Sequence, residues 1–222
     1  MGAKINLAFL SDLSSEEALI KIVNCLRERA WTIDCSEKGE YTYWLDGPIW
    51  MFGNSRTFKN IEKKEIEQVI ETYGKGFSPT IILHSNRFAN SMSARVSVIE
   101  NQSEWKEVSF SVDRYEVLDA ANAAIQTEIV VELCSIFTDM VESIKPYYGI
   151  GATEIEGLVE RPEKLAIGGN MLGDIAYFSA KAAKNLKIRE IEGSYECKKL
   201  SDSGWLLTRR INLFRLVGEG GS

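Results

Sequence analysis

The sequence predicts an α+β protein in which mostly antiparallel sheet, in one or more sheets, is packed by a long central helix and two or three shorter helices. Two observations support this class. Strand-like segments follow one another through short polar turns, which is typical of antiparallel pairing. One long segment, residues 115–144, repeats apolar residues at three- and four-residue spacing, as a packed helix does.

The first elements are predicted to be a strand, a helix and a hairpin. The apolar segment 4–10 (KINLAFL) predicts the strand. Ser14, followed three residues later by Glu17, forms a capping-box pattern that predicts the start of the helix. Residues 31–36 and 41–45 flank a turn that contains glycine, and they predict the hairpin.

The middle of the chain predicts a second helix, a buried strand and a second hairpin. Asn60 and Gly74 are placed as the N-cap and the C-terminal stop of the helix. Residues 79–86 (PTIILHSN) predict the buried strand. Residues 93–100 and 104–113 alternate apolar and polar residues around a short turn, which predicts the hairpin.

The long helix is expected to end at Pro146, before a looser stretch that contains Gly149 and Gly151. A phosphate-binding loop needs a strand before its glycines and a helix after them. Here a helix precedes the glycines and an acidic extended segment follows them. The glycine pair is therefore predicted to be a turn.

The C-terminal part predicts a strand near 176–178, a short helix near 179–186, and a final hairpin from 194–200 and 205–210.

The length of 222 residues suits one domain of ordinary size. We expect a single domain over residues 1–217, or two sub-lobes that meet near residue 114. The terminal GEGGS segment, residues 218–222, resembles a flexible linker.

The charge balance favours a basic partner. The formal net charge is −6 and the isoelectric point is about 5.1, which argues against direct contact with nucleic acid. No stretch has the length or hydrophobicity of a membrane span, and the N-terminus does not read as a signal peptide, so we expect a cytoplasmic protein without membrane contact. The four cysteines form no CxxC pair, which predicts neither a zinc site nor a disulfide framework.

No residue pattern predicts catalysis, a metal or a cofactor. His84 is the only histidine, and a hydrolytic triad would need Ser85 or another serine together with an acid. No serine lies in a GxSxG context. We therefore expect a protein that is not an enzyme, with a hydrolase that uses unidentified carboxylates as a minor alternative.

The long helix carries an acidic sector. Glu128, Glu132, Ser135, Asp139 and Glu142 fall close together on a helical wheel. This sector is either a solvated face or a docking surface for a basic protein. Acids and aromatics after the helix could extend it. The residues predicted to bind a partner are Glu128, Glu132, Asp139, Glu142, Tyr147, Tyr148, Glu154 and Glu156.

The C-terminal half resembles a known family layout. A long helix that ends in KPYYG is followed by an acidic segment, by AYFS, by a short helix and by a hairpin turned at SDSGWLL. Over about residues 115–210 this is similar to the immunity proteins of bacterial polymorphic toxin systems, in particular those grouped as immunity protein 52. The sequence has DSGW where a double glycine is more usual. The resemblance implies a non-enzymatic protein that binds and blocks a cognate toxin, which we expect to be basic.

An alternative is a phage or bacterial conflict-system protein that sequesters a small anionic ligand such as a nucleotide. Loops 47–57 and 149–173 would form its pocket, and Arg56, Arg87 or Arg161 would meet the anion.

Overall fold

The structure is a computed structural model that describes residues 4–32, 40–44, 55–59, 80–85, 92–100, 104–117, 127–154, 172–185, 191–210 and 213–214. The predicted helix between Asn60 and Gly74 lies outside these residues.

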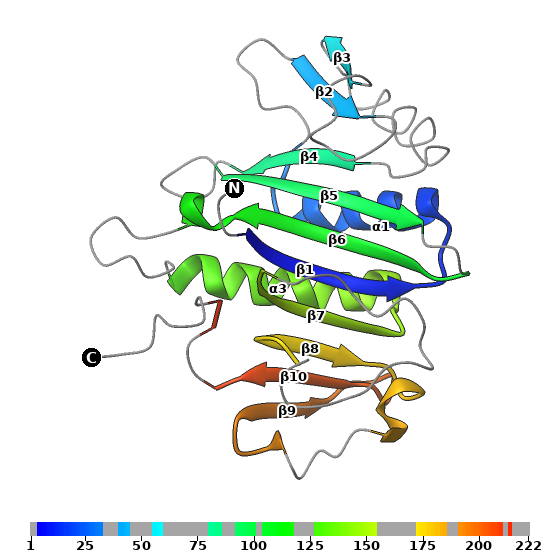
Figure 1. Ribbon diagram of the computed structural model, residues 1–222, viewed down its shortest axis with the longest axis vertical. Helices are drawn as coiled ribbons and strands as arrows, with labels where there is room; N and C mark the ends of the chain where they lie inside the picture. Colours follow the sequence, from blue (N-terminus) through cyan, green and yellow to red (C-terminus); the bar gives the residue numbers. More distant parts are fainter. Residues whose placement is uncertain are drawn as a thin grey trace.

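The described strands form one ten-stranded sheet, and every pair of neighbours runs antiparallel (Figure 1). Their order is β3-β2-β4-β5-β6-β1-β7-β8-β10-β9. Their bounds are β1 (Lys4–Ser11), β2 (Glu40–Trp44), β3 (Ser55–Lys59), β4 (Thr80–Ser85), β5 (Met92–Glu100), β6 (Lys106–Asp113), β7 (Tyr148–Thr153), β8 (Ile175–Phe178), β9 (Tyr195–Lys199) and β10 (Trp205–Arg209). The predicted α+β class with an antiparallel sheet is confirmed.

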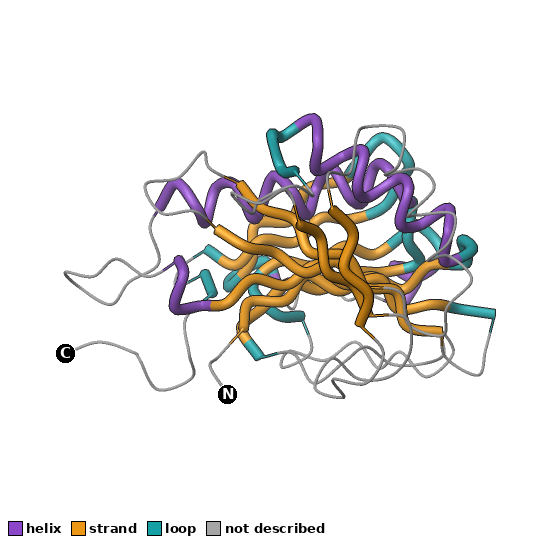
Figure 2. The backbone as a smooth tube through the Cα atoms, turned by 90° about the horizontal axis from the view of Figure 1, so that it is seen from above, coloured by secondary structure: helices purple, strands orange, loops and turns teal. Residues whose placement is uncertain are grey.

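Two α-helices lie on one face of the sheet, α1 (Ser15–Glu28) and α3 (Thr127–Ile144) (Figure 2). Both helices turn apolar side chains toward the strands, and together they form the main core. Phe9 of β1 and Phe137 of α3 lie at the centre of this core, with ring centroids 4.8 Å apart. Most of the hydrophobic stabilisation therefore lies between the helical layer and this face of the sheet.

The helix predictions hold only in part. The capping box is confirmed, because the Ser14 side chain accepts from the backbone N–H of Glu17 and the Glu17 carboxylate accepts from the N–H of Ser14. The long central helix is not confirmed. A 3₁₀ helix, η2 (Arg114–Val117), stands where that helix was expected to start, and α3 begins at Thr127. A second 3₁₀ helix, η5 (Ala182–Asn185), falls within the short helix expected near 179–186.

The hairpin predictions are confirmed for two of the three hairpins. The hairpins β5–β6 and β9–β10 are confirmed. The pairing of 31–36 with 41–45 is not observed in the described residues. There β2 pairs with β3 and, at one position, with β4, while Thr32 forms only an isolated bridge with His84.

The prediction that Gly149 and Gly151 form a turn is wrong, because both lie inside β7. Their missing side chains make room for the core on the helical face. A Cβ atom on Gly149 would lie 2.4 Å from Cδ1 of Phe9, and one on Gly151 would lie 2.6 Å from Cγ2 of Ile175. Glycine within a strand commonly marks such a close approach. The two glycines therefore let bulky side chains of β1 and β8 pack across β7.

Candidate functional site

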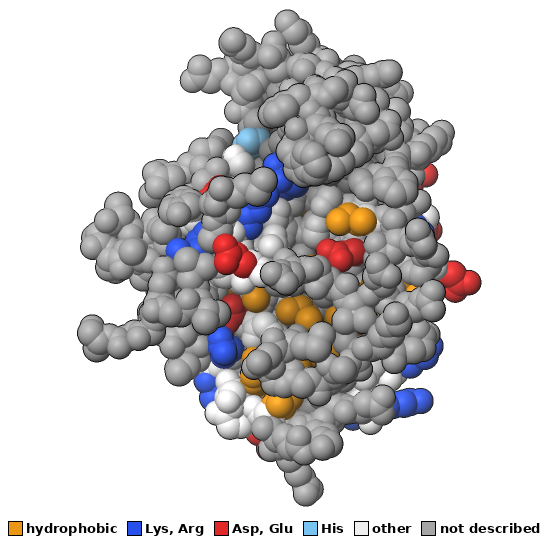
Figure 3. Space-filling view, in the orientation of Figure 1, with side chains coloured by type: hydrophobic (Ala, Val, Ile, Leu, Met, Phe, Trp, Pro, Cys, Tyr) orange, Lys and Arg blue, Asp and Glu red, His pale blue; other side chains and the backbone are white. Residues whose placement is uncertain are grey.

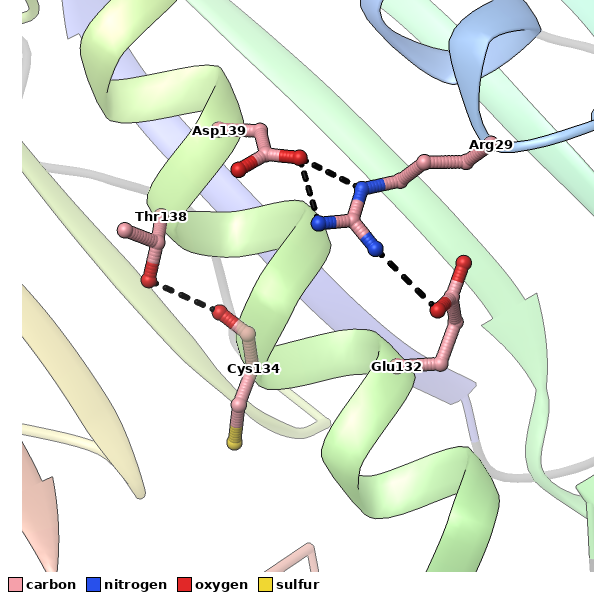
Figure 4. Close-up of polar contacts among 5 residues, drawn as sticks. All are labelled: Arg29, Glu132, Cys134, Thr138 and Asp139. Carbon is pink, nitrogen blue, oxygen red and sulfur yellow. Dashed lines mark hydrogen bonds and ion pairs between the residues drawn. The ribbon is translucent and has the colours of Figure 1, made fainter.

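Two acids of the predicted acidic sector form ion pairs with a basic side chain at the end of the neighbouring helix. Arg29, the C-cap of α1, points at α3 and binds two of its acids (Figure 4). Its Nε and Nη2 atoms both lie 2.5 Å from Oδ2 of Asp139, and its Nη1 atom lies 3.1 Å from Oε2 of Glu132. A planar guanidinium suits this arrangement, because its donors fan out in fixed directions.

Burial separates these two acids from the rest of the sector. Glu132 is only 7% exposed, and Asp139 is half-buried beside Arg29. The prediction that Glu132 lies on a free anionic ridge is therefore wrong. The side chain of Asp139 stays 40% exposed while it pairs with Arg29, so its part in partner binding stays a prediction. Both acids connect α3 to α1 through Arg29. Sequence reasoning missed Arg29 because it precedes its partners by more than a hundred residues.

The exposed part of the sector consists of Glu128 and Glu142 near the two ends of α3. Val131 lies between them in sequence and is 61% exposed. Ser135, the polar member of the sector, is half-buried. The surface that α3 presents therefore combines two carboxylates with an apolar side chain.

The structure does not place the predicted aromatic and acidic extensions on the helical layer. Tyr148 is fully buried and stacks on Phe178, with centroids 6.3 Å apart, so its prediction as an exposed anchor is wrong. Tyr147 is half-buried and packs edge-on against Trp105 at 5.3 Å. Glu154 is exposed after the end of β7, where its backbone N–H donates to the carbonyl of Lys4. Glu156 lies outside the described residues.

The sheet face opposite the helices has two unlike halves. Strands β7, β8, β9 and β10 cover their half with a second apolar cluster that includes Tyr148, Ile150 and Phe178. Strands β4, β5, β6 and β1 carry polar residues there, because successive side chains of a strand alternate between faces. Figure 3 views this face and shows Lys and Arg side chains above a group of hydrophobic ones. The polar positions are Lys4, Asn6, His84, Ser93, Arg95, Ser97, Ser109, Ser111 and Asp113.

A cavity of about 200 Å³ opens within this polar half. The described residues that line it are Lys4, Ser93, Ala94, Arg95, Ser111, Val112 and Asp113. Arg95 is half-buried, and its Nε–H is enclosed without a hydrogen-bond partner among the described residues. An enclosed donor without a partner costs about 1–3 kcal/mol. The alternating pattern of residues 93–100 contained the signal for this position, because Arg95 stands among serines at every second residue.

The electrostatics of the cavity are set by burial and by two neighbouring cations. Burial lowers the pKa of Arg95, although a guanidinium stays protonated at neutral pH. Burial also lowers the pKa of Lys4, followed by repulsion from Arg95, while Asp113 acts in the opposite direction. The cavity therefore gathers two positive charges and one carboxylate.

His84 lies on the same face and contacts a serine, but the serine differs from the one considered first. Its Nδ1 atom is 3.1 Å from Oγ of Ser93, whereas Ser85 is buried on the helical side. Among the described residues, no acid forms a hydrogen bond with the imidazole. The pair is a strand-to-strand hydrogen bond without the third member of a triad.

Protonation of His84 is expected to destabilise the fold. Burial lowers the pKa of His84 below its ordinary value of 6.5, so the unfolded chain binds the proton more readily than the folded chain. Stability is therefore lost as the pH falls through about 6.5, and it is present above that value. Urea unfolding at about pH 7.5 and about pH 5.5 measures this effect. The wild type should lose more unfolding free energy on acidification than His84→Gln, and equal losses would contradict the assignment.

Most residues of loops 47–57 and 149–173, which were predicted to form an anion pocket, lie outside the described residues. Arg87 and Arg161 lie outside it, and Arg56 lies in β3 without a described side chain.

Within the described ranges, no three His, Cys, Asp or Glu side chains are grouped so that they could hold a metal ion. No helix in the same ranges combines the length and the apolar character needed to cross a membrane.

Comparisons with protein-family models, with curated proteins and with solved structures find no match to this chain.

Proposed function

We propose that the chain is a non-catalytic protein that binds and blocks a basic protein partner, as an immunity protein does with its toxin. The observation that carries this proposal is the charge of the helical layer. Helices α1 and α3, together with Arg29, contain seven carboxylates and three basic side chains. The carboxylates are Glu16, Glu17, Glu28, Glu128, Glu132, Asp139 and Glu142.

The layer suits association with a basic surface for two physical reasons. Its excess negative charge raises the rate at which a basic partner reaches it. The exposed Val131 offers apolar contact area beside Glu128, and interfaces combine such area with a polar rim. The resemblance over residues 115–210 includes α3, and it supports the same mode of action. The proposed setting is the bacterial cytoplasm, with a toxin as the blocked partner.

Charge reversal of the exposed acids is expected to weaken this interaction without harming the fold. In Glu128→Lys with Glu142→Lys, both changes fall on solvent-exposed positions, so stability should change by less than about 1 kcal/mol. Partner affinity should fall about tenfold or more at low salt, and the difference should shrink near 1 M salt, where the Debye length is about 3 Å. Capture of partners from a lysate of the source cells, followed by mass spectrometry, identifies the partner. Titration calorimetry at low and at high salt then measures its affinity.

The matched control is Glu196→Lys, an exposed charge reversal on β9, away from the helices. The wild type and this control should retain one basic protein at equal stoichiometry. Unchanged affinity in the double variant would remove the helical layer as the interface. Failure of the wild type to retain any basic protein would contradict the proposed function.

A further inference from the structure

The cavity on the polar half of the sheet brings together cations from two strands that are not neighbours. Arg95 of β5 pairs with Ser111 of β6, and Ser111 pairs with Asn6 of β1. Lys4 lies two residues before Asn6 and therefore on the same face, opposite Asp113. The sheet thus sets an arginine and a lysine on either side of one hollow whose floor is strand β6.

The charges in this hollow are incompletely balanced. Arg95 and Lys4 carry like charges, and their repulsion adds to the effect of burial in lowering the pKa of Lys4. Asp113 is the carboxylate among the described lining residues. The enclosed Nε–H of Arg95 has no acceptor within the described part of the chain. An anion seated there would reduce the repulsion and would supply the missing acceptor.

The size and the donors of the hollow define the class of ligand. A volume of about 200 Å³ is below the roughly 300–1,000 Å³ of pockets that enclose drug-sized molecules. The lining offers a guanidinium, an ammonium and the hydroxyl of Ser111, whereas the hydroxyl of Ser93 already contacts His84. Guanidinium and ammonium groups are common partners of phosphate oxygens, and serine hydroxyls can donate to them as well.

We propose that this cavity binds a phosphate group, with Arg95 and Lys4 as its principal partners. The group is either free inorganic phosphate or the phosphate of a larger molecule whose remainder lies outside the hollow. This site is on the opposite side of the sheet from the helical layer, and it does not depend on the proposed partner. It also differs in position from the pocket expected in loops 47–57 and 149–173.

The proposal is tested by titration calorimetry on the full chain at constant ionic strength, with inorganic phosphate and with AMP as probes. The wild type should bind at least one of them. Similar affinity for both identifies the phosphate as the recognised group, and binding of inorganic phosphate alone identifies the free ion. Arg95→Gln and Lys4→Gln should each weaken binding about tenfold or more, since each removes one charged contact. Arg95→Lys should bind between Arg95→Gln and the wild type.

Two matched variants distinguish specific binding in the cavity from non-specific attraction of the anion to positive charge. Asp113→Asn removes the competing carboxylate without changing its shape and should tighten binding. Lys198→Gln removes an exposed lysine of β9 and should leave binding unchanged. Absence of binding of both probes to the wild type would overturn the proposal. Equal weakening by Lys4→Gln and Lys198→Gln would also overturn it. Should Arg95→Gln fail to fold, Lys4→Gln decides the matter, because its side chain is exposed.

Discussion

Gly149→Val is expected to lower the free energy of unfolding by about 3 kcal/mol, because the added side chain has no space. Its Cβ atom alone would lie 2.4 Å and 2.9 Å from two ring carbons of Phe9 and 3.3 Å from the carbonyl oxygen of Ala8. Phe9 cannot retreat easily, since it is fully buried and packs on Phe137. Urea unfolding followed by circular dichroism measures the loss.

The control for this variant is Gly193→Val. Among the described residues, a Cβ atom at Gly193 meets no atom within 4 Å, so the same substitution should change stability by no more than about 0.5 kcal/mol. Similar losses in the two variants would show that glycine flexibility, and not the contact with Phe9, determines the effect.

Glu132→Lys is expected to cost about 3–5 kcal/mol, the range observed when one member of a buried ion pair is removed. The substitution leaves Arg29 without one of its two acids and adds a second cation next to it. Glu132 is 7% exposed, so water cannot screen this repulsion well. Thermal and urea unfolding of the purified variant measure the loss.

Glu128→Lys provides the matched comparison, because it reverses the same charge one helical turn earlier at an exposed position. It should cost no more than about 1 kcal/mol, the upper range for a charge in the first turn of a helix. Equal stabilities of the two variants would mean that the Arg29 contact contributes little. Because a loss at Glu132 would mimic a loss of binding, reversal of Glu132 or Asp139 cannot serve as a test of the interface.

Local signals in the sequence predicted the elements whose stabilising contacts are themselves local. The capping box of Ser14 and Glu17 lies within one helical turn, and the paired strands β5 and β6 follow each other closely in the sequence. The strand β7 was missed because two glycines lower its strand propensity. The reason for those glycines lies in Phe9 and Ile175, which are distant in sequence.

The same distinction explains the outcome for the candidate sites. The helical wheel grouped the acids of α3, but it could not show that Arg29, at the end of α1, pairs with two of them. The alternation of β5 placed Arg95 among polar residues, but only the strand order brings Lys4 to the same cavity. Charge patterns along one element could therefore be predicted, whereas charge contacts between elements distant in the sequence could not.

The central position of β1 has a consequence for synthesis on the ribosome. Its first neighbour, β6, follows about a hundred residues later, and its second neighbour, β7, follows later still. At elongation rates of about 5–20 residues per second, the nascent β1 waits on the order of 5–20 seconds before any partner strand emerges. A chain released before residue 148 would leave one long edge of this apolar strand bare, which makes truncated products prone to aggregate.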